Sequence, residues 1–464
     1  MGAEAHPLAG RLKPGTVQRV LHLAFVLVAL VLAVRWARAA LPRYLPKDWA
    51  MAHVLDALED WGAARLYLDG VNPYSKAGAE ALHTVAFGHP PTALLWVLPL
   101  APLEKPIAAE LMSLSTWFLL ALGLYICARE LRFPSPIALS ILLFGWALTT
   151  EGLLVHFHAI QSSEQIAFAL VVAWVYLRRG REVPAGIALA VAATFKLFPG
   201  VLFLVLLLAR RFRAFVVACL GFGLAVAVVT VRFGVGLWKE FLVQQEPIAK
   251  LWMGHVRNQS LTGAIMRLLQ PLCVAPPVPT PKANFIATAI ALVLLALAAF
   301  ASRRALRRAR TEDPRAIDVP FALFSTIAVF INPWIWEHYW VLLIQPAFVV
   351  TGTLYARLRD TFQDWLDETA SHRALALAAL PSAVGVAGIG LIAKLVEMQG
   401  VHVEHFWDEY ATTKNDWAHH QVHLYEVVGT APWVLMILLC FMAAPFVGPS
   451  PPRPPPGAGS ADPV

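Results

Sequence analysis

Three carboxylates stand close together near the start of the chain, at Asp56, Glu59 and Asp60. The stretch 50–70 is predicted to be helical, with Gly70 as its stop. The i, i+3 and i+4 spacing then puts all three carboxylates on one face. Clustered like charges raise one another's pKa, and a carboxylate tuned in this way suits general-base catalysis. The alternative is a solvated face of an interfacial helix.

A single lysine, Lys196, interrupts the long apolar run 184–209. A charge at membrane depth costs roughly 2.5–3.5 kcal/mol on insertion scales, so it normally faces a cavity or a partner. One interpretation is a counter-charge for the phosphate of a lipid, because an ammonium group acts as a point charge. The alternative is a lysine whose side chain snorkels to the membrane interface.

The third group is Trp336-Glu337-His338, which is predicted to begin a helix. His338 could bind a phosphate oxygen or a sugar hydroxyl, and Glu337 could orient it. The alternative is that Trp336 only belongs to an aromatic belt. The histidine-rich stretch 402–423 lacks a recognisable zinc spacing such as His-Glu-x-x-His. We therefore expect a solvated loop there and no metal site.

The elements that must position these residues are membrane segments. The chain has 464 residues, of which 58% are hydrophobic, and a bilayer crossing takes about 20 apolar residues. Apolar runs lie near 20–37, 107–127, 136–153, 163–178, 214–233, 285–301, 316–333, 339–356, 374–396 and 427–447. The net charge of +7 comes from short basic clusters between these runs, which are typical topology signals and not a nucleic-acid surface. The fold predicted is an all-α polytopic integral membrane protein.

Charge placement predicts which side each loop faces. If the Lys and Arg clusters near 129–132, 178–181, 210–213, 303–310 and 357–359 are all cytoplasmic, the run 184–209 must enter the membrane and return. We expect a short broken hairpin that turns near 196–200. About 12 membrane segments then form one domain, 1–447, with both ends inside and a disordered cytoplasmic tail at 448–464. The external loops are predicted at 38–106 (with interfacial helices), 234–284 and 397–426, and this is the side where the three polar groups meet.

Several short motifs, in the same order along the chain, resemble glycosyltransferase family 87. They are Asp56-x4-Trp61-x-Ala63-Ala64-Arg65 with Gly70-x-Asn72-Pro73-Tyr74, then Pro90-Pro91-Thr92, Gln161, Gly186 to Pro199 with Lys196, Asn258-Gln259-Ser260-Leu261 with Arg267, and Pro333-x-x-Trp336-Glu337-His338. The chain departs from the family pattern at His89, Ile160, Ile335 and Tyr339.

The resemblance implies a GT-C type fold and an enzyme of the cell membrane that acts on its extracytoplasmic face. The donor would be a polyprenyl-phosphate sugar, most simply mannose, the acceptor a lipid or glycan, and no cofactor is expected. Asp56 matches the catalytic base, with Asp60 and Asp48 as rivals. The expected substrate-binding residues are Lys196, Gln161, Asn258, Arg257, Arg267, Glu337 and His338. The alternatives are a transporter or flippase of lipid-linked sugars and a non-catalytic membrane protein of envelope assembly.

Overall fold

The computed structural model describes residues 14–44, 55–82, 88–133, 135–150, 153, 162–255, 257–269, 279–366, 372–398 and 416–446, and the elements in these ranges are helices. The α-helices are α1 (Pro14–Tyr44), α2 (Leu55–Leu68), α3 (Lys76–Ala81), α4 (Leu94–Val97), α5 (Lys105–Glu130), α6 (Pro136–Ala147), α8 (Ser163–Arg178), α9 (Glu182–Phe195), α10 (Leu202–Leu208), α11 (Phe212–Phe233), α12 (Gly236–Trp252), α13 (Leu261–Leu269), α14 (Pro281–Thr311), α15 (Asp318–Phe330), α16 (Ile344–Leu366), α17 (His372–Met398) and α19 (Asp416–Ala443). Short 3-10 helices are η1 (Pro91–Ala93), η2 (Leu98–Leu100), η3 (Phe198–Val201), η4 (Pro314–Ile317), η5 (Glu337–Leu343) and η6 (Ala444–Phe446).

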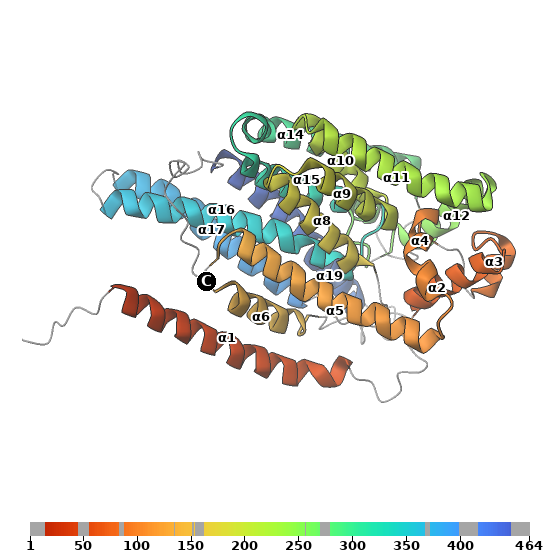
Figure 1. Ribbon diagram of the computed structural model, residues 1–464, viewed down its shortest axis with the longest axis horizontal. Helices are drawn as coiled ribbons and strands as arrows, with labels where there is room; N and C mark the ends of the chain where they lie inside the picture. The colour runs from red at the N-terminus through yellow and green to blue at the C-terminus, as the bar shows by residue number, and fades with distance from the viewer. Residues whose placement is uncertain are drawn as a thin grey trace, which may run out of the picture.

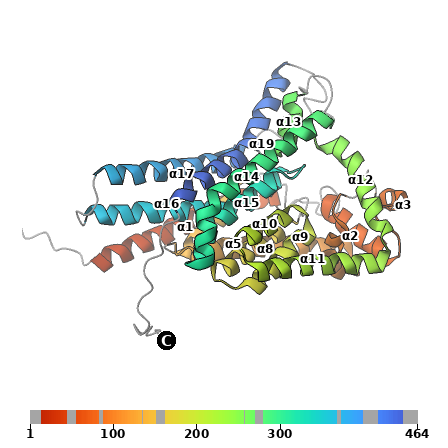
Figure 2. The same cartoon turned by 90° about the horizontal axis from the view of Figure 1, so that it is seen from above.

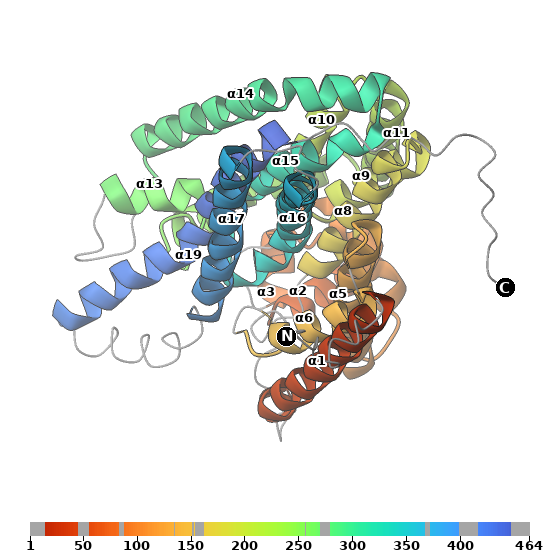
Figure 3. The ribbon, with the colours of Figure 1, turned by 90° about the vertical axis from the view of Figure 1, so that its left-hand side faces the viewer.

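Seven helical segments within the described ranges are long and apolar enough to cross a bilayer. They are Leu23–Ala40, Lys105–Glu130, Phe212–Phe233, Pro281–Thr311, Glu337–Thr361, Ala379–Val396 and Gly429–Phe446. Figures 1 and 2 show many of the long helices running along the long axis of the molecule. In the end view of Figure 3, α16 and α17 point at the viewer as a packed pair, with α14 across the top and α1 below. The prediction of an all-α polytopic membrane protein is confirmed, whereas the total of 12 segments stays a prediction.

Several helices are longer than the apolar runs from which they were predicted. Helix α1 reaches Tyr44, inside the predicted loop 38–106, and α19 begins at Asp416, inside the predicted loop 397–426. A helix satisfies its own backbone hydrogen bonds and so continues beyond the hydrocarbon core, while hydropathy marks only its apolar part. The predicted loop 234–284 likewise contains α12 and α13.

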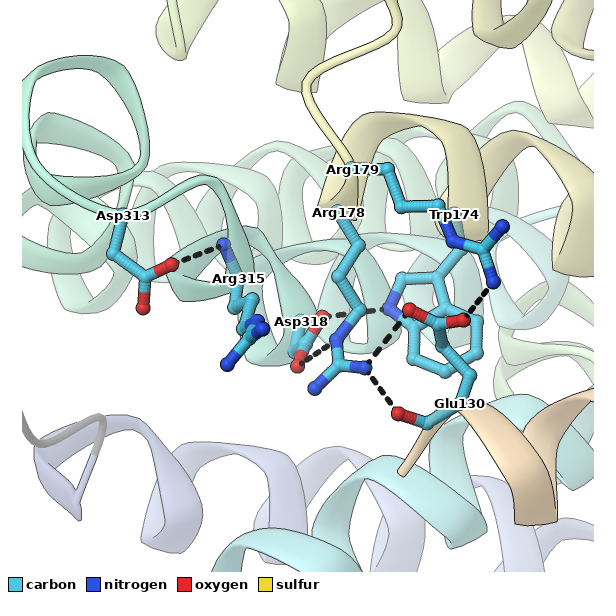
Figure 4. Close-up of polar contacts among 7 residues, drawn as sticks. All are labelled: Glu130, Trp174, Arg178, Arg179, Asp313, Arg315 and Asp318. Atoms are coloured by element: carbon cyan, nitrogen blue, oxygen red, sulfur yellow. Dashed lines mark hydrogen bonds and ion pairs between the residues drawn. The ribbon is translucent and has the colours of Figure 1, made fainter. Parts of the chain in front are cut away.

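Partly buried ion pairs tie the basic connectors together, as Figure 4 shows. Arg178 Nη1 lies 3.1 Å from Glu130 Oε1, and its Nε lies 2.9 Å from Asp318 Oδ2. The indole of Trp174 donates to the other oxygen of Asp318 at 2.9 Å. This network joins the end of α5, the end of α8 and the start of α15.

Arg211 extends the same arrangement to the next two basic clusters. Its guanidinium donates to the backbone carbonyl of Ala309 near the end of α14 and pairs with Glu182 at 3.5 Å. Four of the five predicted basic clusters therefore lie at one end of the bundle. That this end faces the cytoplasm stays a prediction.

The run 184–209 is a broken hairpin. Helix α9 ends at Phe195, Lys196 is extended, and η3 turns the chain into α10. The pair between Glu182 and Arg211 brings the two ends of the hairpin together. Helix α9 packs between α8 and α11, and its 14 residues span about 21 Å. Lys196 is thereby held far from the basic network.

Candidate active site

The first carboxylates lie on α2, whose end is set by Gly70 in a left-handed conformation, φ +77°. Asp56 is in the first turn of α2, and its side chain lies outside the described part of the chain. Asp60 is buried, and its Oδ1 lies 2.6 Å from His89 Nδ1. His89 is a partner that the sequence indicated only as a departure from the family pattern.

The hydroxyl of Tyr74 fixes the backbone beside this pair. It donates to the carbonyl of His89 at 2.7 Å. Burial, reinforced by the charge of Asp60, raises the pKa of Tyr74 well above its usual 10. The hydroxyl therefore keeps its proton and remains a donor.

The segment after His89 reaches the turn of the hairpin. Thr92 Oγ1 donates to the carbonyl of Thr194 at 2.9 Å, and Trp96 Nε1 donates to Thr194 Oγ1 at 2.7 Å. Thr194 is two residues before Lys196. The carboxylate region and the hairpin turn are thus joined through η1 and α4.

Lys196 is directed at Tyr339. Its Nζ donates to the tyrosine hydroxyl at 2.5 Å and lies 4.4 Å from the centre of the ring. The residue that departs from the family pattern at 339 is therefore the one that Lys196 contacts.

Two loops far apart in sequence are joined by the amide of Asn258. Its Nδ2 donates to the carbonyls of Met253 at 2.8 Å and Pro333 at 2.9 Å, and its Oδ1 accepts from the backbone of Ile335 at 3.1 Å. The backbone of Gln259 adds a bond to the carbonyl of Ile335 at 2.8 Å. Asn258 is fully buried, so the two loops form one unit.

This unit carries two guanidinium groups. Arg257 forms an ion pair with Glu337, which is only 1% exposed. Arg267 is buried and donates to the carbonyls of His255 at 2.9 Å and Asn258 at 2.8 Å. Burial, followed by the charges of Arg257 and Arg267, lowers the pKa of His255 to about 4. His255 is therefore neutral near pH 7, and the arginines supply the positive charge.

Of the remaining residues predicted from the sequence, the structure describes His338 but not Gln161 or Asp48. His338 is buried next to Tyr339, with ring centres 4.8 Å apart. Gln161 and Asp48 lie outside the described residues, as do the side chains of the stretch 402–423. In the described ranges, no group of three or more His, Cys, Asp or Glu side chains is arranged to hold a metal ion.

Helix α12 closes a ring of contacts around the site. Asn72 Nδ2 donates to Glu240 at 2.5 Å, and Gln244 Nε2 donates to the carbonyl of Tyr74 at 3.0 Å. Helix α12 is thus held against the turn that follows α2, and its end leads into the loop of Arg257. Figures 1 and 2 place α2, α3 and α12 together at one end of the molecule.

The family model for glycosyltransferase family 87 matches residues 87–333, which is more than half of the 464 residues. The chain belongs to glycosyltransferase family 87. It is a membrane glycosyltransferase. The matched range contains Lys196, Arg257 and Arg267, whereas Asp60 and Glu337 lie outside it. The contacts described above connect those two residues to the matched part of the glycosyltransferase.

A curated relative of the glycosyltransferase is the polyprenol-phosphate-mannose-dependent alpha-(1-2)-phosphatidylinositol mannoside mannosyltransferase of Mycolicibacterium smegmatis (strain ATCC 700084 / mc(2)155). The two chains are 28% identical over 322 residues, which cover 64% of this chain and 68% of the relative. No solved structure matches the chain significantly.

Proposed function

We propose that this glycosyltransferase moves a sugar, most simply mannose, from a polyprenyl-phosphate donor to a lipid or glycan acceptor on the extracytoplasmic face of the cell membrane. The name of the mycobacterial relative supports a donor of this kind. The observation that carries the proposal is the ring of contacts at the end of the bundle away from the basic network. It includes the contacts of Asp60 with His89, of Lys196 with Tyr339 and of Arg257 with Glu337.

The reaction would be a single displacement with inversion at the anomeric carbon. Asp56 takes the proton of the acceptor hydroxyl, and the hydroxyl oxygen forms a bond to the anomeric carbon. The bond between that carbon and the phosphate oxygen breaks, and the polyprenyl phosphate leaves with the electron pair. A phosphate leaving group does not strictly need a general acid, unlike the leaving group in glycoside hydrolysis.

Lys196, Arg257 and Arg267 would bind the phosphate, whose negative charge grows as the bond breaks. Lys196 donates to the hydroxyl of Tyr339, and an ammonium group would serve as a point charge for the phosphate. Arg257 is paired with Glu337, and 25% of its side chain is exposed, which leaves part of the guanidinium for a ligand. His338, in the same 3-10 helix as Glu337, would bind a sugar hydroxyl or a phosphate oxygen.

Asp60 remains the rival base. Its hydrogen bond to His89 orients the carboxylate. The imidazole would also be the next acceptor for a proton that Asp60 takes from the acceptor hydroxyl. A carboxylate that is positioned by a histidine is a common arrangement for proton transfer. We assign Asp60 a supporting role because Asp56 is the residue that matches the family's base.

The test is the substitution Asp56→Asn in purified protein, assayed for transfer from polyprenyl-phosphate mannose. We expect a loss of about 10²–10⁴-fold in turnover, because a positioned base contributes about that much, with donor binding retained. Asp69→Asn is the matched control, since Asp69 is exposed at the end of the same helix, and it should leave turnover unchanged.

Retained turnover in Asp56→Asn together with its loss in Asp60→Asn would make Asp60 the base. The face of the membrane is tested separately in sealed and opened vesicles with labelled donor. Movement of label between leaflets without transfer to an acceptor would mean a flippase and would refute the proposed reaction.

A further inference from the structure

A stripe of exposed arginines lies at the C-terminal end of α14, the helix along the upper edge of the bundle in Figure 3. Its members are Arg303, Arg304, Arg307 and Arg310. Steps of three and four residues put Arg303, Arg307 and Arg310 on one face of the helix, with Arg304 beside them. The proposed reaction uses none of these four residues.

The arginine stripe faces away from the bundle, because the other side of the same turns is buried. Ala305, Leu306 and Ala309 are each at most 4% exposed, and α14 packs on α15 and η4. The neighbouring Arg308 is used within the protein, since it pairs with Glu312 at 3.2 Å. In the described part of the chain, none of the four arginines of the stripe pairs with a carboxylate.

The same face of α14 is apolar in the turns before the arginine stripe. Four side chains there are at least half exposed, namely Leu292, Val293, Leu297 and Phe300. The helix is apolar and long enough to cross a bilayer, so these side chains face lipid tails. Arg303 lies at the boundary. Its guanidinium stands 3.7 Å from the centre of the Phe300 ring and donates to the carbonyl of Phe300 at 3.1 Å.

The length of the arginine stripe matches the layer that follows the lipid tails. From Arg303 to Arg310 the helix rises about 10 Å. The headgroup layer on each side of the hydrocarbon core is about 5–8 Å thick. The stripe therefore runs through the headgroup layer to water. A guanidinium group suits lipid phosphate, which it can bind through two parallel hydrogen bonds.

We propose that the arginine stripe binds the headgroups of anionic phospholipids in the leaflet at its own end of the bundle. The stripe complements a headgroup with a net negative charge, whereas a zwitterionic headgroup is neutral overall. Each basic side chain close to an anionic lipid surface favours binding about fivefold. The bound lipids would hold α14 in place where Arg211 donates to the carbonyl of Ala309, and so stabilise the folded bundle. This site is independent of the proposed reaction.

Native mass spectrometry of the purified full chain tests this site. Protein in neutral detergent is mixed with equal amounts of phosphatidylglycerol and phosphatidylcholine that have the same acyl chains. We expect the wild type to retain phosphatidylglycerol in preference to phosphatidylcholine. A variant in which glutamine replaces all four arginines should retain at least about tenfold less phosphatidylglycerol. The substitutions are Arg303→Gln, Arg304→Gln, Arg307→Gln and Arg310→Gln.

The matched control removes the same amount of charge from exposed basic residues outside the stripe. Its substitutions are Lys105→Gln, Arg232→Gln, Lys239→Gln and Lys282→Gln, and it should retain phosphatidylglycerol as the wild type does. Equal retention by the wild type and the stripe variant overturns the proposal, and so does equal retention of both lipids by the wild type. Displacement of the lipid by an equal concentration of glycerophosphoglycerol, which has the headgroup without acyl chains, would also overturn it.

A second measurement decides the question if the four-residue variant does not fold. Phosphatidylglycerol added to the detergent should raise the thermal unfolding midpoint of the wild type by about 2 °C or more, because a ligand of the folded state stabilises it. Phosphatidylcholine should not. The shift should be smaller in Arg307→Gln and should vanish at about 1 M NaCl, which screens exposed charges. The proposal is wrong if phosphatidylglycerol produces no shift, or the same shift in Arg307→Gln and in high salt.

Discussion

Asn258 shows how one buried amide can position a site without touching a substrate. Its donors and its acceptor are all used inside the protein, on carbonyls and backbone N–H groups of two separate loops. Its amide therefore has little hydrogen-bonding capacity left for a ligand. The substrate-binding role of Asn258 stays a prediction, whereas the hydrogen bonds give the residue a structural role.

Asn258→Asp tests that role. An ionised carboxylate cannot donate to the carbonyls of Met253 and Pro333, and each buried group left without a partner costs roughly 1–3 kcal/mol. We expect a clear fall in the thermal unfolding midpoint in detergent. Asn332→Asp is the control, because Asn332 is less buried and its side-chain amide donates to the carbonyl of Trp334 in its own loop at 2.6 Å. Equal midpoints for the two variants would contradict the assignment.

At the scale of residues, the sequence indicated which side chains were unusual but not which ones meet. Lys196 stood out because a charge in an apolar run is costly, yet its contact with Tyr339 spans 143 positions. The pairing of Asp60 with His89 was missed for the same reason. The only signal was that His89 and Tyr339 both replace residues of the family pattern, and a pairing between distant loops leaves no periodic trace in one sequence.

Among the elements, the hairpin was predictable and the short helices around it were less so. Two flanking basic clusters and too few residues for two spans force a hairpin between 184 and 209. The runs 136–153 and 316–333 were predicted as membrane segments, but their helices α6 and α15 have only 12 and 13 residues, fewer than the about 20 of a full crossing. Their place in the bundle depends on packing that hydropathy does not record.

The packing of α9 on α11 depends on Gly186. A Cβ atom at this position would lie 2.5 Å from the backbone oxygen of Ala214 and 2.9 Å from Val217 Cβ. We expect Gly186→Ala to destabilise the protein by about 1–3 kcal/mol through overpacking, despite the better helix propensity of alanine. The measurement is the unfolding midpoint in detergent.

Gly223→Ala is the matched control for that prediction. Gly223 is in α11, and a Cβ there meets nothing within 4 Å. This variant should be neutral or up to about 1 kcal/mol more stable, because alanine favours the helix. A Gly186→Ala variant that also gains stability would show that the two helices can move apart freely.

For the whole molecule, the basic connectors and the candidate site lie at opposite ends of the bundle. The ion-pair network of Arg178 and Arg211 marks one end, and the ring of contacts that includes Lys196 and Arg257 marks the other. The sequence predicted this separation from its basic clusters alone. It did not predict how α12 would lie against the turn at 72–74, because that contact depends on two side-chain amides.

Single cysteines test which end faces outward. Lys250 and Arg304 are exposed residues at opposite ends of the bundle. In a background without Cys219 and Cys273, we expect an impermeant maleimide to label Lys250→Cys in intact cells. Arg304→Cys should be labelled only after permeabilisation. The reverse pattern would place the site on the cytoplasmic side and refute the proposed orientation.

The broken hairpin also bears on how the chain enters the membrane during synthesis. Helix α9 spans about 21 Å and α10 has only seven residues, so neither limb can cross a hydrocarbon core of about 30 Å alone. The pair between Glu182 and Arg211 can form only after both limbs have left the ribosome. Helix α9 also needs α11 as a neighbour. We therefore expect residues 182–233 to insert together, with the lysine of the site reaching its position only after that whole segment has been made.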